Sequence, residues 1–411
     1  MRIFFICLRV PFPPDRGDKI VTFNLIRHLS ASHEVHVFCL SDGATDDADV
    51  AALEEYARNV TAVPRSSVSE KFRGMRAILS GVPLSVALVN EKRLHLAVKS
   101  TSVKFPPDLI IVYSSNVAQY AINLDDIPRL MYFGDLDSQK WLEYVEKYTF
   151  PINLIYRREG RLLLDYERKI AKTFSHSLVC TVAEKHDFER LIPGSAVDIL
   201  TNGVDLERFR SHHIPKQAGT MIFTGVMNYF PNVDGAQWFC ESVLPLIRER
   251  VPQATFMICG TSPTATVQRL AKRPGVIVTG AVPDVRPYLD AAEICVVPLR
   301  IARGIQNKLL EGLAMGLPCV SSRSSWGGTV IEEGEGILVA DDPTEFAEHA
   351  IRLLQDDQYR ELMARKARAV VEEKYRWEDQ LQRLDLIIER MTAGKHHEAG
   401  RTDQSADLSG C

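Results

Sequence analysis

Short apolar runs alternate with longer segments of helical spacing along most of the chain. In the first half the runs lie at residues 2–8, 34–40, 108–114, 129–133 and 176–182. In the second half they lie at residues 220–225, 254–260, 275–281, 293–299 and 317–322. Each run is continuous in apolar residues instead of alternating with polar ones, which is typical of strands buried on both faces. Helical stretches such as 233–250 and 264–273 stand between the runs, so the pattern predicts an α/β fold with doubly wound parallel sheets.

The length of 411 residues favours two such domains over a single core. We place them at residues 1–203 and 204–374, with the polar, turn-rich segment 201–219 as a hinge. Residues 375–391 are expected to form a C-terminal helix that packs back on the first domain. Residues 392–411 have no apolar periodicity and are expected to be a disordered tail.

Composition narrows the class of protein further. The net charge of −4 argues against a general nucleic-acid binder. No apolar run is long enough to span a bilayer, and Arg9 and Pro11 interrupt the start too early for a secretory signal, so we expect a cytoplasmic chain. The cysteines form no C-x-x-C pair and the histidines show no ligand spacing, so we expect no metal site. Six cysteines lie in the apolar runs and are expected to be small buried residues: Cys7, Cys39, Cys180, Cys259, Cys295 and Cys319.

The candidate chemistry lies after the run at 293–299. Ligands of doubly wound sheets bind at the carboxyl ends of the strands, and this strand leads into RGIQNKLLEGLAMGLP, residues 303–318. Gly304 permits close approach of the backbone, and the free N–H groups at the start of the next helix attract a phosphate. Arg303 and Lys308 add full positive charge.

Glu311 follows Asn307 by four residues, so both side chains can face one ligand. A diphosphate would repel the Glu311 carboxylate, whereas the two hydroxyls of a ribose can donate to it. A plain structural interpretation stays open for the same stretch, namely a capped helix with solvated charges at its start. Its core residues would then be Leu309, Leu310, Leu313 and Met315.

The segment NKLLEGLAMGLPCVSS resembles the sugar-nucleotide motif of GT-B glycosyltransferases, specifically the large retaining family numbered four, the glycosyl transferases group 1. Three more segments resemble that family in the correct order, namely DRGDKIVTFNLIRHLS (15–30), TNGVD (201–205) and FTGVMNYFPNVDGAQWF (223–239). VMNYFPNVDGAQWF and FGDLDSQKW (133–141) are similar to a subgroup associated with bacterial exopolysaccharide and PEP-CTERM/exosortase loci. The resemblance extends to about Met391.

The resemblance implies two Rossmann-like domains that face each other across a cleft, the first on the acceptor side and the second binding a nucleotide sugar. It implies transfer of a sugar from a nucleotide-diphosphate donor to a glycan or polyprenyl-linked acceptor, with retention, in polysaccharide biosynthesis. The nucleotide sugar is then a donor substrate, and no separate cofactor is expected. The residues assigned to the donor are Arg16, Gly17, Gly225, Asn228, Asn232, Gly304, Ile305, Gln306, Asn307 and Glu311, and those assigned to catalysis are Asp135, Arg303 and Lys308.

The sequence departs from the family pattern at three places. The family has two glutamates eight residues apart, and Glu311 matches the second whereas Arg303 stands at the first. The family also has an Arg and a Lys after the glycine that matches Gly225, and neither is present in GVMNYFPN. Arg303 and Lys308 would then carry the charge that holds the diphosphate, with help from Arg16 or Lys19. The histidine that the family often has in the segment matching YFGDLDS is replaced by acidic residues.

Two loops of the first domain are further candidates. The loop LRVPFPPDRGDKI is stiffened by prolines, Gly17 brings backbone close to a ligand, and Asp18 is expected to cap the next helix. In FGDLDSQKW the Asp135 carboxylate could orient or deprotonate an acceptor hydroxyl. An N-cap by Asp137 or Ser138 explains the same segment equally well.

The segment 157–174 is rich in both charges and leaves two interpretations open. It is either a solvated helix face with Leu162, Leu163 and Ile170 in the core, or a surface that docks on the inner face of an anionic membrane carrying a lipid-linked acceptor. Asp234 is expected to cap a helix.

Two other functions remain open at the level of sequence. A sugar-nucleotide 2-epimerase would have a similar two-domain shape, but it requires acid–base groups that the matching loops do not offer. A non-catalytic nucleotide- or glycan-binding homologue would explain the missing Glu, Arg and Lys.

Overall fold

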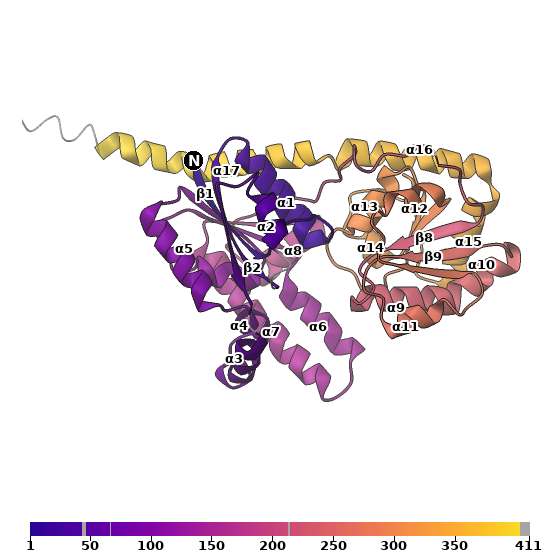
Figure 1. Ribbon diagram of the computed structural model, residues 1–411, viewed down its shortest axis with the longest axis horizontal. Coiled ribbons are helices and arrows are strands. Elements are labelled where there is room, and N and C mark those ends of the chain that lie inside the picture. The colour runs from indigo at the N-terminus through magenta and orange to yellow at the C-terminus, as the bar shows by residue number, and fades with distance from the viewer. Residues whose placement is uncertain (43–46, 66, 213, 403–411) are drawn as a thin grey trace, which may run out of the picture. The chain divides into compact units, whose positions relative to one another are not determined.

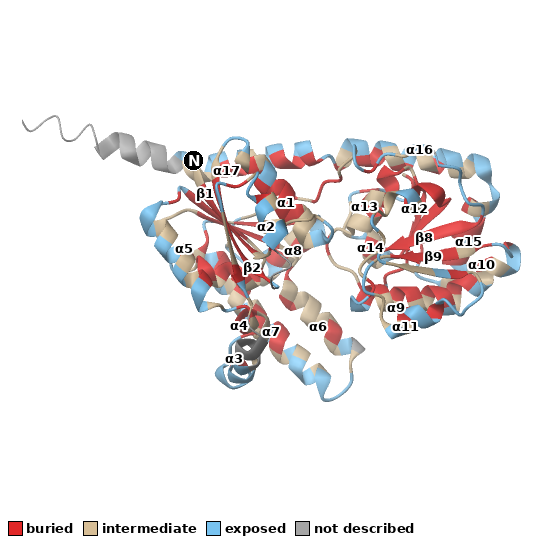
Figure 2. Cartoon of the chain, viewed as in Figure 1, coloured by how far each residue is buried: buried red, intermediate tan, exposed pale blue. Residues whose placement is uncertain are grey.

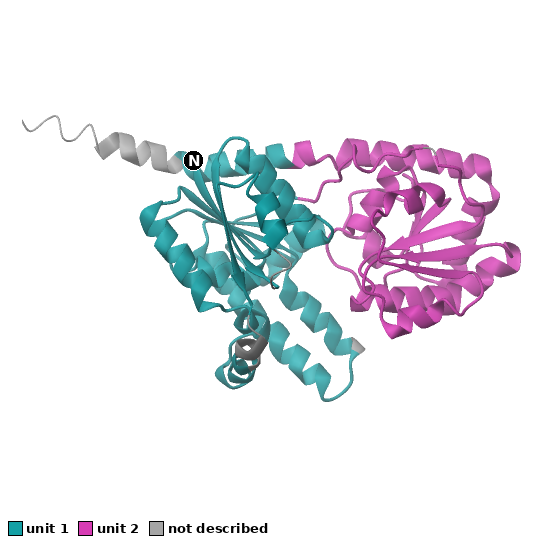
Figure 3. Ribbon diagram, viewed as in Figure 1, with its two compact units in different colours: residues 1–200, 381–411 teal, residues 201–380 magenta. Residues whose placement is uncertain are grey.

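The computed structural model describes residues 1–42, 47–65, 67–212 and 214–402, and it divides into two compact units (Figures 1 and 3). Unit 1 consists of Met1–Leu200 and Leu381–Cys411, and unit 2 of Thr201–Gln380. The segment 201–219, expected to be a hinge, belongs to unit 2, where the Asp290 carboxylate accepts hydrogen bonds from the Ser211 hydroxyl at 2.6 Å and the His212 N–H at 2.7 Å.

Unit 1 contains a seven-stranded parallel sheet in the order β3-β2-β1-β4-β5-β6-β7. Its strands are β1 (Arg2–Arg9), β2 (Glu34–Ser41), β3 (Asn59–Pro64), β4 (Leu109–Tyr113), β5 (Arg129–Gly134), β6 (His176–Val179) and β7 (Val197–Ile199). Its helices are α1 (Gly17–Ser30), α2 (Asp47–Leu53), α3 (Ser67–Ser80), α4 (Leu84–Leu88), α5 (Lys92–Lys104), η2 (Ser115–Tyr120), α6 (Asp137–Lys147), α7 (Ile152–Thr173) and α8 (Val182–Leu191).

Unit 2 contains a six-stranded parallel sheet in the order β10-β9-β8-β11-β12-β13. Its strands are β8 (Thr220–Thr224), β9 (Thr255–Cys259), β10 (Val276–Gly280), β11 (Ile294–Val297), β12 (Cys319–Ser321) and β13 (Ile337–Val339). Its helices are α9 (Phe230–Trp238), η3 (Phe239–Val243), α10 (Leu244–Arg250), α11 (Ala265–Leu270), α12 (Arg286–Ala291), α13 (Asn307–Ala314), α14 (Arg323–Trp326), α15 (Pro343–Gln355) and α16 (Asp357–Lys374).

The apolar runs form strands that are almost fully buried (Figure 2). Ile3, Phe4, Phe5 and Ile6 of β1 have no exposed surface, because helices cover both faces of the sheet. The prediction of doubly wound parallel sheets is therefore confirmed. The seven described cysteines are all buried and free, including the six named above.

Strands β3, β7 and β13 were missed by the apolar pattern. β3 lies at a sheet edge and is only partly buried, so polar residues such as Asn59 and Thr61 interrupt its pattern. β7 and β13 have three residues each, which is too short for periodicity to identify.

In each sheet the strand order reverses beside the first strand of the unit. β1 lies between β2 and β4, and β8 lies between β9 and β11. The loops after β1 and β4, and after β8 and β11, diverge to opposite faces at these points, which opens space for a ligand at the carboxyl ends.

The C-terminal helix α17 (Trp377–Thr402) returns to unit 1 from Leu381 onward. Asp385 accepts a hydrogen bond from the His28 ring at 2.9 Å, and Arg390 donates to Asp198 at 2.9 Å. The expectation of a disordered tail from residue 392 is wrong for residues 392–402, because α17 continues past Met391 to Thr402. Residues 403–411 lie outside the described part of the chain.

Candidate active site

The loop after β8 is shaped by two glycines. A Cβ on Gly225 would lie 2.8 Å from the Asn232 side-chain nitrogen and 3.2 Å from the Lys308 Nζ, and its φ of +154° disfavours any other residue. A Cβ on Gly260 would lie 1.7 Å from the Gly225 carbonyl oxygen. The backbone at the carboxyl end of β8 therefore packs directly against polar side chains, with no room for a side chain of its own.

Lys308, in the first turn of α13, reaches this glycine. Its Nζ donates a hydrogen bond to the Asn232 Oδ1 at 2.6 Å and lies 4.9 Å from the centroid of the Phe223 ring. The Asn232 amide donates in turn to the Val226 carbonyl at 2.9 Å, which fixes the amide orientation. Burial lowers the pKa of the Lys308 ammonium to about 8, against a smaller opposing effect of Glu311. The Lys308 ammonium therefore lies at the carboxyl end of β8, and its hydrogen-bond partner there is the neutral side chain of Asn232.

Glu311 lies one turn further along α13 and makes no side-chain hydrogen bond or ion pair with the described residues. Burial raises the pKa of its carboxyl to about 7, while the charges of Arg208 and then Lys308 act in the opposite direction. A partly buried carboxylate without a donor is costly, so Glu311 is prepared for a ligand that donates hydrogen bonds.

The head of α13 has no side-chain cap. Gln306 occupies the N-cap position, and its amide donates to the Arg303 carbonyl at 3.0 Å instead of capping the helix. Gly304 has a φ of +63°, and its carbonyl oxygen lies 1.9 Å from where a Gly328 Cβ would be. Ile305, Gln306 and Asn307 follow as the turn into the helix, so the first N–H groups of α13 remain available to an anion.

Asn307 is held by the segment that follows unit 1 in sequence. The amide of the buried Asn202 donates a hydrogen bond to the Asn307 Oδ1 at 2.8 Å. Val204 also bridges to Arg376 in a short parallel pairing. Asn202, in the TNGVD motif, and Arg208 were not among the predicted site residues. The motif itself was a signal for Asn202, whereas nothing in the sequence places Arg208 near Glu311.

Asn228, in the loop after β8, and Asp234, in the following helix α9, differ in their side-chain contacts. The Asn228 side chain is exposed and makes no hydrogen bond with the described residues. Asp234 does not cap α9 as expected, because it lies inside the helix and forms an ion pair with Arg300 through two contacts, one of 2.9 Å. The cap position is held by Tyr229, without a side-chain hydrogen bond.

In unit 1, Arg16 and Gly17 are exposed at the start of α1, after β1. Asp18 is not the cap of α1, because the helix begins at Gly17 and Asp18 lies in its first turn. Its carboxylate pairs with Arg9 at 2.7 Å and with Arg16 at 2.9 Å. Lys19 donates to the Phe12 carbonyl at 3.1 Å, so its charge is partly used within the loop.

Asp135 lies at the carboxyl end of β5, the strand that pairs with β4. Its Oδ1 accepts a hydrogen bond from the Cys180 thiol at 3.0 Å. Burial and then Asp18, Asp135, Cys180 and Asp137 raise the pKa of the Tyr113 hydroxyl well above its usual value, so these groups share one carboxyl-end region of the sheet.

The alternative interpretation of this segment, an N-cap by Asp137 or Ser138, is wrong. Leu136 holds the cap position of α6 without a side-chain hydrogen bond. The Ser138 hydroxyl instead donates to the buried Glu167 Oε2 at 2.5 Å. Burial raises the pKa of Glu167 to about 8 and also raises that of Asp137.

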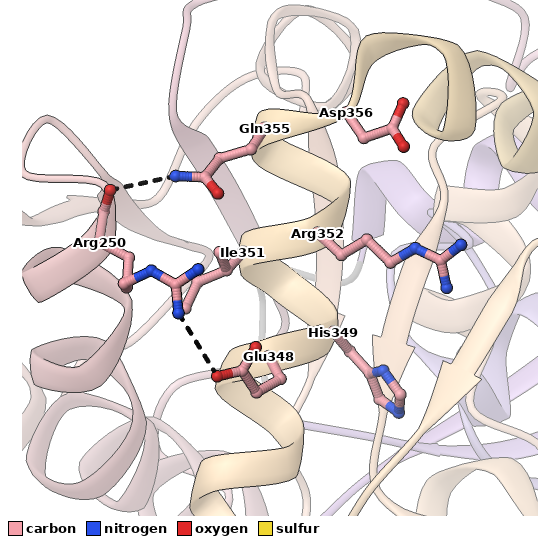
Figure 4. A pocket seen from close by; sticks show the side chains of 7 residues that line it. All are labelled: Arg250, Glu348, His349, Ile351, Arg352, Gln355 and Asp356. Carbon is pink, nitrogen blue, oxygen red and sulfur yellow. Dashed lines mark hydrogen bonds and ion pairs between the residues drawn. The ribbon is translucent and has the colours of Figure 1, made fainter.

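A shallow hollow on unit 2 is lined by Arg250, Glu348, His349, Ile351, Arg352, Gln355 and Asp356 (Figure 4). Arg250 pairs with Glu348 at 3.7 Å, and its carbonyl accepts from Gln355 at 3.1 Å. Because α10 ends at Arg250 and leads into the start of β9, this hollow lies at the amino ends of the strands, away from α13. The described residues contain no cluster of three or more metal-ligating side chains.

The structure thus brings Gly225, Asn232 and Lys308 together. Glu311 is close enough to Lys308 for their charges to interact. Gly304, Ile305, Gln306 and Asn307 form the adjoining turn, and Arg303 precedes it. Arg16, Gly17 and Asp135 lie in unit 1 at the carboxyl ends of its own strands. The assigned roles of these residues stay predictions.

Known proteins that are similar to this chain have the same fold of two parallel-sheet units. Residues 218–356 match the family described as glycosyl transferases group 1. An uncharacterized 44.6 kDa protein in the cps region of Klebsiella pneumoniae is 19% identical over 405 residues, which cover 91% of this chain and 96% of that protein.

Among solved structures, sucrose-phosphate synthase from Thermosynechococcus elongatus is similar with a TM-score of 0.72 and 16% identity, covering 96% of this chain and all of that one. HepE from Anabaena in complex with UDP and glucose is similar with a TM-score of 0.66 and 14% identity, covering 95% of this chain and 100% of that one. Residues 218–356 thus match the glycosyl transferases group 1, and the chain is a glycosyltransferase with the GT-B fold.

Proposed function

We propose that the enzyme transfers a sugar from a nucleoside diphosphate sugar to a hydroxyl of a glycan or lipid-linked acceptor in polysaccharide biosynthesis, with retention of configuration. The observation that carries the donor assignment is the spacing of Lys308 and Glu311 on one turn of α13, beside the side-chain-free backbone of Gly225. One group is a cation suited to a diphosphate, and the other is a carboxylate with no donor of its own.

The diphosphate lies at the head of α13 in this proposal. The uncapped N–H groups of the first turn and the helix dipole favour an anion there, and Lys308 and Arg303 add charge. The leaving nucleoside diphosphate gains negative charge as the glycosidic bond breaks, so preorganised donors at this point stabilise the transition state more than the ground state.

Glu311 accepts hydrogen bonds from the two ribose hydroxyls. Such donors favour its ionised form and offset the cost of burial that raises its pKa. Arg208 supports the same ionised form by its charge. The hydroxyls, and not the phosphates, are the suitable partners because a diphosphate would add like charge beside the carboxylate.

Uridine is the preferred base in the proposal, supported by HepE, whose structure holds UDP and glucose. A role in polysaccharide biosynthesis is supported by the Klebsiella relative, which is described as a protein of a cps region. Asp135 orients the acceptor hydroxyl at the carboxyl end of β5, and a lipid-linked acceptor places the enzyme at the inner face of the membrane.

The test is release of nucleoside diphosphate from UDP- and GDP-sugars, with and without a polyprenyl diphosphate-linked monosaccharide acceptor. The proposal expects acceptor-dependent release for one donor and a product whose anomeric configuration, read by NMR, equals that of the donor. Release no faster than in the absence of acceptor for every donor tested would contradict it, and an inverted product would contradict retention alone.

A further inference from the structure

The second half of α3 carries large apolar side chains that are exposed; Figure 2 draws exposed residues of this helix in pale blue. Phe72 is 66% exposed, Met75 59% and Leu79 87%. These residues follow helical spacing and form one stripe, while Ala77 on the other side of the helix is buried. Large apolar side chains gathered at this exposure are unusual on a monomeric surface and mark an interaction site.

The start of α7 extends this stripe. Arg158 of α7 donates hydrogen bonds to the carbonyls of Ala77 and Ile78 at 2.7 and 3.1 Å, which sets the end of α3 against α7. Leu154 and Ile155, about one turn before Arg158, are 51% and 50% exposed. We call Phe72, Met75, Leu79, Val82, Leu154 and Ile155 together the α3–α7 patch.

The patch stands on a rigid base. The buried Glu159 carboxylate accepts from the N–H groups of Leu84 and Ser85 at 2.7 and 2.9 Å and so fixes the start of α4 to α7. Three residues earlier on α7, the Tyr156 ring packs against Trp141 at 5.4 Å between centroids and against Tyr148 at 5.0 Å. The first part of α7, which carries Leu154 and Ile155, is therefore joined to α4 and to the aromatic side chains of α6.

Arginines border the patch. Arg76 lies on the same stripe of α3 as Met75 and Leu79, and Arg157 and Arg161 continue the exposed face of α7 beyond Leu154. All three are exposed. Among the other charges of the 157–174 segment, Arg158 and Glu159 bond α3 and α4, and Glu167 is buried against Ser138. The exposed Asp165 pairs with Arg168 at 3.0 Å. The exposed first part of α7 thus combines Leu154 and Ile155 with the positive charges of Arg157 and Arg161.

We propose that the α3–α7 patch docks on an anionic lipid bilayer, with its apolar side chains inserted at the headgroup boundary and Arg76, Arg157 and Arg161 against lipid phosphates. Helices that carry apolar residues beside arginines bind membrane interfaces in this way. A protein partner would match the apolar part but gives no reason for the arginine border. The inference deepens the proposed function by naming the surface through which the enzyme reaches a lipid-linked acceptor, and its test involves no sugar transfer.

The test is co-sedimentation of the full chain with vesicles of phosphatidylcholine alone or containing about one third phosphatidylglycerol. Wild type is expected to sediment with the anionic vesicles at low salt and much less with the neutral ones. The double variant Leu79→Glu, Ile155→Glu should lose more than about tenfold in partitioning, because it removes apolar burial and adds repulsion. Arg76→Ser with Arg157→Ser should weaken binding to the anionic vesicles by about fivefold per arginine.

Leu386→Glu is the matched control, since Leu386 of α17 is 59% exposed in the same unit but outside the patch. It should sediment like wild type. Equal sedimentation of wild type and the Leu79→Glu, Ile155→Glu variant, or no binding of wild type to either vesicle, overturns the proposal. A wild-type dimer in size-exclusion chromatography that this variant converts to a monomer would assign the patch to a second copy of the chain instead. A thermal shift with UDP in both proteins keeps this result separate from the donor assignment.

Discussion

The side-chain amide of Asn202 donates a hydrogen bond to the Asn307 Oδ1 over 2.8 Å. Asn202 belongs to the segment that opens unit 2, and Asn307 is the first residue of α13. The bond therefore fixes the head of the proposed donor helix to a residue more than a hundred positions earlier in the chain.

Asn202→Ala should destabilise unit 2 by about 0.5–1.5 kcal/mol, the range for one hydrogen bond, and loosen the turn at 304–307. Chemical denaturation measures the first effect, and UDP affinity the second. Asn307→Asp keeps an acceptor for Asn202 and should retain stability, but its added charge should weaken a diphosphate. Loss of stability without any change in UDP affinity would separate this bond from the donor site.

Lys308 should take up protons when a diphosphate binds. Its pKa is lowered to about 8 by burial, and a neighbouring anion raises the pKa of an ammonium. At pH 8, calorimetric titrations of UDP in buffers of different ionisation enthalpy should therefore report net uptake by the protein.

Lys308→Arg is the control, because an arginine remains charged at this pH and should remove the uptake while keeping part of the affinity. Lys308→Ala should weaken UDP by about 1.5–3 kcal/mol and uridine much less. Equal losses for UDP and uridine would place Lys308 away from the phosphates.

Glu311→Gln should weaken both uridine and UDP by about 10- to 150-fold, which corresponds to the loss of charge from its hydrogen bonds. Equilibrium binding of the two ligands measures this change. Unchanged uridine affinity would exclude Glu311 from the ribose.

The same variant should change the pH dependence of stability in the free enzyme. Because the folded pKa of Glu311 is raised from 4.5 to about 7, its contribution is fully present below pH 4.5 and is lost as pH rises through 7. Glu311→Gln should therefore flatten the decline of the free energy of unfolding between these pH values. Denaturation series across this range provide the measurement, and identical slopes in both proteins would contradict the assignment of the pKa.

Arg303→Ala should lower turnover by a factor on the order of 100 or more, the scale for one preorganised charge stabiliser. Arg303→Glu should be worse, because it sets a carboxylate against the phosphates. If Arg303 only paired with a surface acid such as Glu293 or Glu332, alanine would cost under about 1 kcal/mol of stability and leave turnover nearly intact. In the structure Glu293 already pairs with Arg360 at 3.3 Å. Wild-type kinetics for Arg303→Glu would refute the role.

Gly225→Ala should disrupt the same site without changing a charge. Its Cβ would crowd the Asn232 amide and the Lys308 Nζ at a φ of +154°, so we expect a loss of about 1–3 kcal/mol of stability and weaker UDP binding. Gly280→Ala, at a left-handed position with no atom near a new Cβ, is the control for backbone strain alone. Equal UDP affinity in wild type and Gly225→Ala would show that the loop tolerates the methyl group.

The strands buried on both faces were predictable because an interior strand has to be apolar on both sides, as in 2–8 and 294–297. Edge strands such as β3 do not have to be apolar on both sides, because part of their surface is in contact with water. Helix caps were the least predictable feature. Asp18, Asp137 and Asp234 all have side chains that can cap a helix, but each lies inside a helix. The cap position is set by the residue at which the backbone turns into the helix, and residue type alone does not determine it.

Within the candidate site, the sequence predicted residues that are close along the chain but not the contacts between distant ones. The head of α13 could be identified from Gly304, Lys308 and Glu311 alone. The pairing of Lys308 with Asn232 and the charge of Arg208 near Glu311 depend on the sheet order, which brings the loop after β8 next to the loop after β11.

Titration of UDP into the wild-type enzyme by isothermal calorimetry, with a thermal unfolding scan at the saturating concentration, tests the donor site most directly. We predict one site per chain and, at about 100 times the dissociation constant, a gain of about 2.7 kcal/mol in the free energy of unfolding. Absence of binding heat and of any thermal shift with UDP and GDP at millimolar concentration would contradict the claim that the head of α13 holds a nucleoside diphosphate.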